Sequence, residues 1–261
     1  MAGRIRTLGL CLVAALSLGA LSAAGAQASA EITARCFKTA KGANHSYHGH
    51  YLNKTCTEEA SAEEIGLGGK SNKYEFGFGE TWSAKGAALK LVTAQGPEVK
   101  CVKSAGSGTI LGPARVEATF TFSKCGSLES ICTTPGLKSG YIATKPLIGV
   151  VGENGDGEVQ VSFTGKEANS TEPAPAETFA EFDCLGEAVH LALHGTLSGK
   201  WTEAPNKLTK TGGIEFAAGT GEQGLIEQFP NITSGETEEE AATLELTQRF
   251  KFKDQYELKQ G

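Results

Sequence analysis

Four side chains in the second half of the chain have the chemistry for acid–base work. Two are carboxylates, Glu181 and Asp183, and two are imidazoles, His190 and His194. Each alternates with apolar residues, so two adjoining strands would present all four on one polar face. A pair of carboxylates is the catalytic machinery of glycosidases, and an imidazole is a common general base. Charged cross-strand pairs also stabilise the solvated face of an ordinary sheet, and we expect that role here.

A second group of potential ligands is the trio His45, His48 and His50, which is flanked by Tyr47 and Tyr51. On an extended segment His48 and His50 share a face, and neutral imidazoles suit Zn²⁺ or Cu²⁺. No further ligand accompanies them at a known spacing. We therefore expect a polar exposed loop at these positions, and we assign no metal and no other cofactor to the chain.

The segment 153–158, Glu-Asn-Gly-Asp-Gly-Glu, places several oxygen ligands beside two glycines. It lacks the twelve-residue spacing and the flanking helices of an EF-hand calcium loop. The Asn154-Gly155 pair is instead a strong signal for a type I′ turn. We expect a plain hairpin turn that joins a strand at 146–151 to one at 159–163.

Motifs that would mark a nucleophile or a nucleotide site are missing from the sequence. It has no G-x-S-x-G elbow, and no P-loop or dinucleotide fingerprint follows a strand. Trp82 and Trp201 could serve as platforms for sugar stacking, although Trp is more often packed into a core. The residues favour a binding or structural role over an enzyme, and we assign no catalytic residue.

The N-terminus has the three parts of a secretory signal peptide. Arg4 and Arg6 precede an apolar stretch, 8–21, that is too short to span a bilayer. Small residues then form A-x-A cleavage sites at 26–28 and 28–30. We expect residues 1–30 to be removed and the mature chain to be secreted without a membrane span, either released or held at the cell surface by protein contacts.

Removal of this leader changes the cysteine count and the charge. It takes away Cys11, and the six cysteines that remain predict three disulfides in an exported chain. It also removes Arg4 and Arg6, so the mature chain has 22 basic and 30 acidic side chains. This acidic balance lacks the basic footprint that a nucleic-acid binder needs, and it disfavours an anionic membrane surface.

Alternation of apolar and polar residues with a period of two predicts β-strands through most of the mature chain. The clearest runs are 116–123 and 244–253, and only Gln248 interrupts the apolar face of the second. Shorter runs lie at 89–91, 99–101, 159–163 and 189–193, separated by Gly, Asn, Ser and Pro. Many short strands with turns between them indicate an all-β fold, an antiparallel sandwich or barrel stapled by disulfides.

The chain is expected to divide into a signal peptide at 1–30, an N-terminal arm or subdomain at 31–72 and a main β domain at 73–261. Within the main domain, 167–177 is expected to be a surface loop and 235–240, with four glutamates, a solvated connection. Two acidic stretches, 61–65 and 237–242, have the spacing of a capping box, and each could form a helical turn.

Several segments, taken in order, resemble a family of secreted proteins from actinobacteria. They are CVKSAGSGTILGP at 101–113, ATFTFSKC at 118–125, CTTPG at 132–136, IATKPL at 142–147 and FAEFDC at 179–184, with CFKTAK at 36–41, YLNKTC at 51–56 and PNKL at 205–208. The resemblance covers most of the mature chain and implies export, bacterial origin and a disulfide-bonded β scaffold. It carries over no activity and no catalytic residue.

Six cysteines allow fifteen connectivities, so the spacing only favours one of them. We expect Cys125 to pair with Cys132 across a short turn after a strand. We expect Cys36 to pair with Cys56, because these two are isolated from the other cysteines along the chain. The remaining pair, Cys101–Cys184, would then link distant strands. The main alternative pairs Cys101 with Cys125 and Cys132 with Cys184.

A two-residue turn at Leu185-Gly186 would set the register of the hairpin that carries the acid–base residues. It pairs Phe182 with Val189 on the apolar face. The same register places Glu181 directly across from His190 on the exposed face, and we expect this pair to be structural.

The sequence therefore predicts a secreted structural or binding module for an unknown protein or glycan at or outside the cell surface. One alternative is a carbohydrate-binding module with exposed tryptophan, and another is an extracellular hydrolase that uses the Glu181/Asp183/His190 face. A concave cleft with buried carboxylates and histidine would favour the hydrolase. A flat strip of exposed Trp and Tyr would favour glycan binding.

Overall fold

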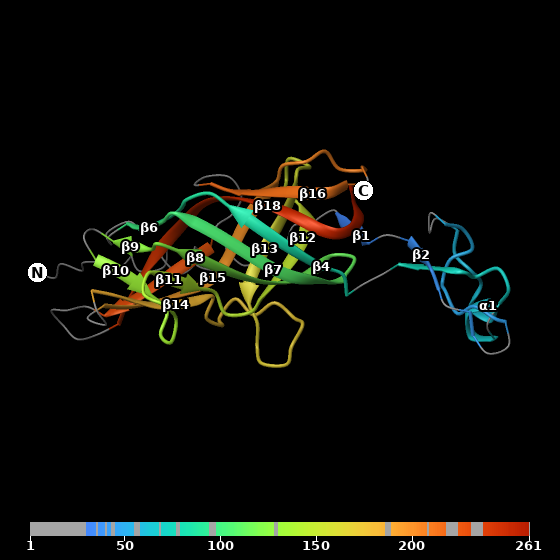
Figure 1. The fold of residues 1–261 in the computed structure, drawn as a ribbon, viewed down its shortest axis with the longest axis horizontal. Helices are drawn as coiled ribbons and strands as arrows, with labels where there is room; N and C mark the ends of the chain where they lie inside the picture. The colour runs from blue at the N-terminus through green and yellow to red at the C-terminus, as the bar shows by residue number, and fades with distance from the viewer. Residues whose placement is uncertain are drawn as a thin grey trace, which may run out of the picture.

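A computed structural model describes residues 30–260, except 35, 40, 43–44, 55–57, 68, 77–78, 94–97, 128–129, 186–188, 208, 218–223 and 231–236. These residues form an elongated antiparallel β-structure with one short helix (Figure 1). The predicted all-β class is confirmed. Among the described residues, no helix is both long enough and apolar enough to cross a membrane.

The chain crosses the main sheet eight times, and we call each crossing a strand path. The paths follow one another in chain order, and most consist of two or three of the labelled strands. They are β4 (Thr81–Gly86) with β5 (Leu89–Thr93), β6 (Val99–Cys101) with β7 (Lys103–Gly112), β8 (Arg115–Ser123) with β9 (Gly126–Ser127), β10 (Ser130–Thr133) with β11 (Tyr141–Ala143) and β12 (Leu147–Glu153), β13 (Val159–Gly165) with β14 (Ala180–Cys184), β15 (Val189–Trp201), β16 (Thr209–Phe216) with β17 (Gly224–Pro230), and β18 (Thr237–Lys259).

The last path, β18, closes the sheet because it pairs with the first path on one edge and with the seventh on the other. Residues 242–245 and 248–252 of β18 pair with β5 and β4. Residues 237–242 and 246–251 pair with β17 and β16. Each path therefore has a neighbour on both sides. Of the two predicted architectures, sandwich and barrel, the chain adopts the barrel.

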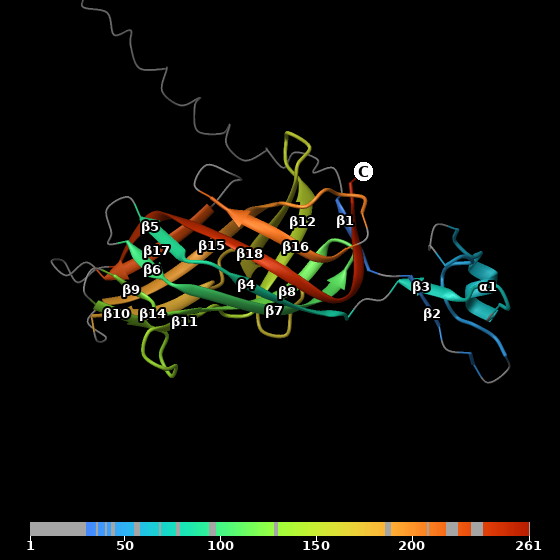
Figure 2. The same cartoon turned by 45° about the horizontal axis from the view of Figure 1, so that its top comes forward.

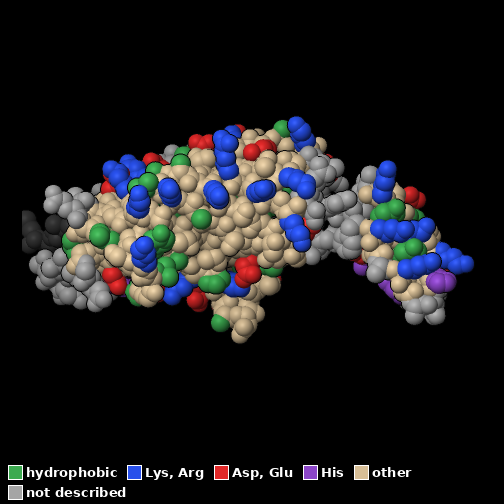
Figure 3. Space-filling model, viewed as in Figure 1, with side chains coloured by type: hydrophobic (Ala, Val, Ile, Leu, Met, Phe, Trp, Pro, Cys, Tyr) green, Lys and Arg blue, Asp and Glu red, His purple; other side chains and the backbone are tan. Residues whose placement is uncertain are grey.

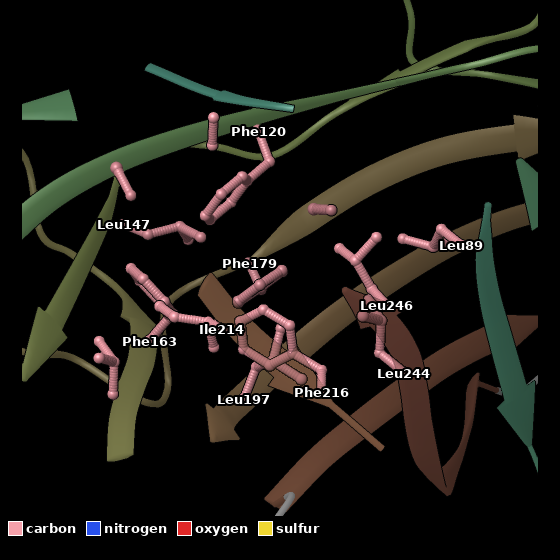
Figure 4. Packing of buried hydrophobic residues seen from close by; sticks show 14 of the residues in the cluster. Leu89, Phe120, Leu147, Phe163, Phe179, Leu197, Ile214, Phe216, Leu244 and Leu246 are labelled. Carbon is pink, nitrogen blue, oxygen red and sulfur yellow. The ribbon is translucent and has the colours of Figure 1, made fainter. Parts of the chain in front are cut away.

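Apolar side chains from alternate strand positions fill the interior of the barrel (Figure 4). The four inward positions of β8 from 116 to 122 are all buried, as the period of two predicts. Trp82 and Trp201 are also part of this core, with only 4% and 8% of their surface exposed. The alternative in which exposed tryptophan forms a platform for sugars is therefore wrong.

The two acidic stretches with capping-box spacing form different secondary structures. The first forms α1 (Ala62–Leu67), where the backbone N–H of Ile65 donates to the carbonyl of Ser61 at 3.0 Å. The second, 237–242, is the start of β18 and pairs with β17, so the predicted helical turn and solvated connection there are wrong. Closure of the sheet outweighs the local capping signal. The stretch 167–177 connects β13 to β14, in agreement with the loop predicted there.

The N-terminal region contributes to both parts of the molecule. β1 (Glu31–Ala34) pairs with the end of β18 and so belongs to the barrel. β2 (Cys36–Lys38) pairs with β3 (Tyr74–Phe76), and with α1 these strands form a small appendage beyond one end of the barrel (Figures 1 and 2). The strand pairing thus places 31–34 in the barrel and 74–76 in the appendage.

The hairpin between β12 and β13 is confirmed, and five residues, 154–158, connect its paired strands. Glu153 pairs with Val159, and the N–H of Gly157 donates to the carbonyl of Asn154 at 3.0 Å. The side-chain Oδ1 of Asn154 accepts the N–H of Asp156 and of Glu158. Positive φ occurs at Gly157 and not at Asn154, so the predicted type I′ turn is wrong.

The disulfides join Cys101 to Cys125 and Cys132 to Cys184. The predicted Cys101–Cys184 and Cys125–Cys132 bonds are therefore wrong, and the alternative pairing is right. All four residues lie in one buried row across neighbouring strands. Cys56 lies outside the described residues, so the Cys36–Cys56 bond stays a prediction.

Backbone hydrogen bonding explains which members of this row are joined. The N–H of Cys132 donates to the carbonyl of Cys125 at 3.1 Å, so those two face each other on their hydrogen-bonded sides. Antiparallel backbones approach more closely at the non-hydrogen-bonded pairs. The Cα atoms are 4.0 Å apart at Cys101–Cys125 and 4.2 Å apart at Cys132–Cys184, and the bonds form there.

Candidate functional site

The hairpin that carries the predicted acid–base residues has a different register from the expected one. Cys184 pairs with Val189, so the connection spans four residues, 185–188, and the predicted two-residue turn is wrong. Glu181 faces Ala192, and the predicted Glu181–His190 pair does not form. The partner numbers shift by two, which keeps every side chain on its expected face.

Asp183 is the residue that meets His190. Its Oδ1 lies 2.7 Å from Nδ1 of His190, and the two residues are directly opposite on β14 and β15. Glu181 instead forms an ion pair with Lys145, whose Nζ lies 3.0 Å from Oε2 of Glu181. Nδ1 of His194 lies 3.2 Å from the carbonyl oxygen of Ala176. Of the four predicted residues, only Asp183 and His190 are brought into contact.

An open groove of about 710 Å³ lies beside Asp183, between β10, the loop 134–140 and the start of the β14–β15 connection. Three large hydrophobic side chains line it while exposed to solvent: Ile131 at 58%, Leu137 at 44% and Leu185 at 54%. The described residues include one other exposed large hydrophobic side chain, Val102. Three of the four exposed large hydrophobic side chains among the described residues therefore line this groove.

Two consecutive turns hold Leu137 at the edge of the groove. The N–H of Leu137 donates to the carbonyl of Thr134, and the N–H of Tyr141 donates to the carbonyl of Lys138, each at 3.0 Å. The third residue of each turn is a glycine with positive φ, Gly136 and Gly140, as a type II turn requires. The local sequence Thr-Pro-Gly-Leu therefore specifies the first turn directly.

The side chains at the base of this loop anchor it to the barrel. Thr134 donates its hydroxyl to the carbonyl of Glu181 at 2.8 Å and accepts the N–H of Ala143. Thr133 accepts the N–H of Gly140 at 2.9 Å. The Cys132–Cys184 bond lies on the inner side of the same two strands. The groove is thus built on a rigid base that holds its exposed side chains in place.

The arrangement does not have the order of a hydrolytic triad. In a triad the imidazole lies between the carboxylate and the hydroxyl. Here the register runs Thr133, Asp183, His190 across three strands, so the carboxylate is in the middle. The second carboxylate of the hypothesis, Glu181, is engaged by Lys145. The site has an apolar rim beside one carboxylate–imidazole contact, which suits binding better than acid–base catalysis.

The other predicted sites lie elsewhere. His45, His48 and His50 are exposed in the appendage, where His50 pairs with Glu75. In the hairpin loop, Glu158 pairs with Lys200, and the hydrogen bond from Lys200 lowers the pKa of Glu158. Within the part of the chain that the structure describes, no group of three or more His, Cys, Asp or Glu side chains is arranged to hold a metal ion.

No protein-family model, curated protein or solved structure matches this chain. The resemblance to secreted actinobacterial proteins therefore stays a prediction. The groove itself was missed by the sequence reasoning, although Thr134-Pro135-Gly136 is a recognisable turn signal. That signal places Leu137 on a turn, whereas only the fold brings Ile131 and Leu185 next to it.

Proposed function

We propose that this protein is an exported binding module that captures a segment of another protein at or outside the cell surface. The observation that carries this proposal is the gathering of Ile131, Leu137 and Leu185 around one groove. Exposed apolar surface has a cost in water that a partner removes by covering it. A partner segment with an apolar side chain for the groove and a basic residue for Asp183 matches this chemistry.

Two further features support export and a binding role. The two disulfides are compatible with an oxidising compartment outside the cytoplasm, and the N-terminus has the composition of a secretory leader. The barrel interior is occupied by packed side chains, which makes the body a scaffold for surface contacts. Rigid scaffolds that present irregular loops are a common basis for recognition.

The proposal is tested by removing the apolar rim without disturbing the barrel. In an Ile131→Ser/Leu137→Ser variant of the mature protein, capture of cross-linked partners from cell-surface and secreted fractions is expected to fall at least about tenfold. Both side chains are exposed, so the thermal midpoint is expected to change little. Val102→Ser is the matched control, because Val102 is 52% exposed and does not line this groove.

Equal capture by the double variant and the original chain would reject the groove as the binding site. A similar loss in Val102→Ser would show that general surface hydrophobicity, and not the groove, determines capture. N-terminal sequencing of secreted material tests export separately, and recovery of intact Met1 would contradict it.

A further inference from the structure

A row of basic side chains lies on the outer surface of the barrel. Its members are Lys85 on β4, Lys103 on β7, and Arg249 and Lys251 on β18, and all four are exposed. We call this row the basic face. Figure 3 shows Lys and Arg side chains following one another along the body of the barrel, with acidic side chains toward the edges of that view.

Strand pairing brings these charges close together. Arg249 is directly opposite Lys85, and Lys251 follows Arg249 by two residues on the same face. Lys85 is also opposite Ala105 on β7. Lys103 lies two residues before Ala105, on the same outer face of that strand. Like charges directly opposite on a sheet are destabilising. The protein therefore maintains an arrangement that its own folding does not favour.

Elsewhere in the described part of the chain, several basic residues have carboxylate partners. Lys145–Glu181 and Lys100–Glu98 are ion pairs at 3.0 Å. The others are Lys90–Glu98, Lys166–Glu117, Lys200–Glu158 and Arg115–Glu172.

Within the described part of the chain, none of the four residues of the basic face has such a partner. The chain carries 30 acidic residues against 24 basic ones, so a row of four neighbouring cations is a local departure from its acidic composition. An unpaired row of cations on an acidic protein creates a local positive potential that total charge conceals.

We propose that the basic face binds a linear anionic polysaccharide. The outer positions beside the charges on the three strands carry Ser83, Ser107 and Thr247, whose hydroxyls can hydrogen-bond to sugars. No aromatic residue occupies an outer position of β4 or β7, or of β18 from 245 to 253. Single-stranded nucleic acids are usually held by base stacking on aromatics, and membrane-surface binding relies on inserted apolar side chains. The chemistry of this face thus favours a charged glycan over either.

The experiment uses mature protein and immobilised heparin as the probe, with binding measured over a salt series. We expect affinity that falls as salt rises, because the contacts are between exposed charges. A Lys85→Gln/Arg249→Gln/Lys251→Gln variant is expected to bind at least about tenfold more weakly at low salt and to show a smaller salt dependence. Its thermal midpoint is expected to stay the same or rise, since like charges are removed.

The charge-matched control is Lys145→Gln/Lys166→Gln/Lys200→Gln, which removes three cations that are already paired. It is expected to retain heparin binding close to that of the original chain. Equal weakening in this control, or no retention of the original protein at low salt, would overturn the proposal. Stronger binding to single-stranded DNA or to anionic lipid vesicles than to heparin would also overturn it. The Ile131→Ser/Leu137→Ser variant should bind heparin normally, so this result is independent of the groove.

Discussion

Trp82 lies directly across from Gly108, and its indole ring occupies the space that a side chain at position 108 would need. A Cβ atom there would be 2.6 Å from Cε2 of Trp82 and closer still to the carbonyl oxygen of Glu117. Gly149 faces the ring of Phe163 in the same way. The interior of the barrel is filled because large rings are set against glycines on the neighbouring strands.

Gly108→Ala is therefore expected to destabilise the protein by about 2–3 kcal/mol, because the added methyl group has no room in a packed core. Gly112→Ala is the matched control on the same strand, since nothing lies within 4 Å of a Cβ there. Its effect is expected to be below about 1 kcal/mol. Urea unfolding followed by tryptophan fluorescence measures both, and equal effects would contradict this account of the packing.

Gln248 is fully buried on the inward side of β18, and its side-chain nitrogen and oxygen have no hydrogen-bond partner among the residues that the structure describes. Burying an unsatisfied amide costs free energy that an apolar side chain of similar size does not. Gln248→Leu is expected to raise the free energy of unfolding by about 1–3 kcal/mol. Gln160→Leu, at a half-buried outer position of β13, should change it by less than about 0.5 kcal/mol. A loss of stability in Gln248→Leu would show that the amide has a structural role.

Peptide mapping under non-reducing conditions should recover Cys101 linked to Cys125 and Cys132 linked to Cys184. Recovery of a Cys125–Cys132 peptide would contradict the observed row of cysteines. These bonds close sequence separations of 24 and 52 residues. On the chain-entropy model, loss of either bond should cost about 3–4 kcal/mol, measured by urea unfolding of the paired Cys→Ser variants.

Tyr256 predicts a fall in stability at high pH. Its burial, and secondarily the negative charge of Glu203, raise the pKa of the Tyr256 hydroxyl well above its ordinary value. Above about pH 10 the unfolded chain loses a proton that the folded chain keeps, so stability decreases by up to about 1.4 kcal/mol per pH unit. Unfolding measured from pH 9 to 11 should show this slope, and Tyr256→Phe should reduce it. An unchanged slope in the variant would assign the effect to other groups.

Local sequence patterns predicted the strands well and their partners poorly. The alternation at 116–123 and 244–253 correctly identifies β8 and the central part of β18, because period-two burial is a property of each strand alone. The same alternation cannot distinguish registers that differ by two residues. It therefore placed Glu181, and not Asp183, opposite His190, while still assigning Phe182 and Leu191 to the buried face.

The sequence by itself determined the all-β class, the inward and outward faces of the strands, and the involvement of four main-domain cysteines in disulfides. Tertiary structure decided what depends on residues far apart in the chain. Closure through β18 brought the cations of β4, β7 and β18 together, and the β10–β14 pairing set Ile131 beside Leu185. The alternation of hydrogen-bonded and non-hydrogen-bonded pairs chose the disulfides. Such contacts depend on which strands become neighbours, and no local pattern encodes that choice.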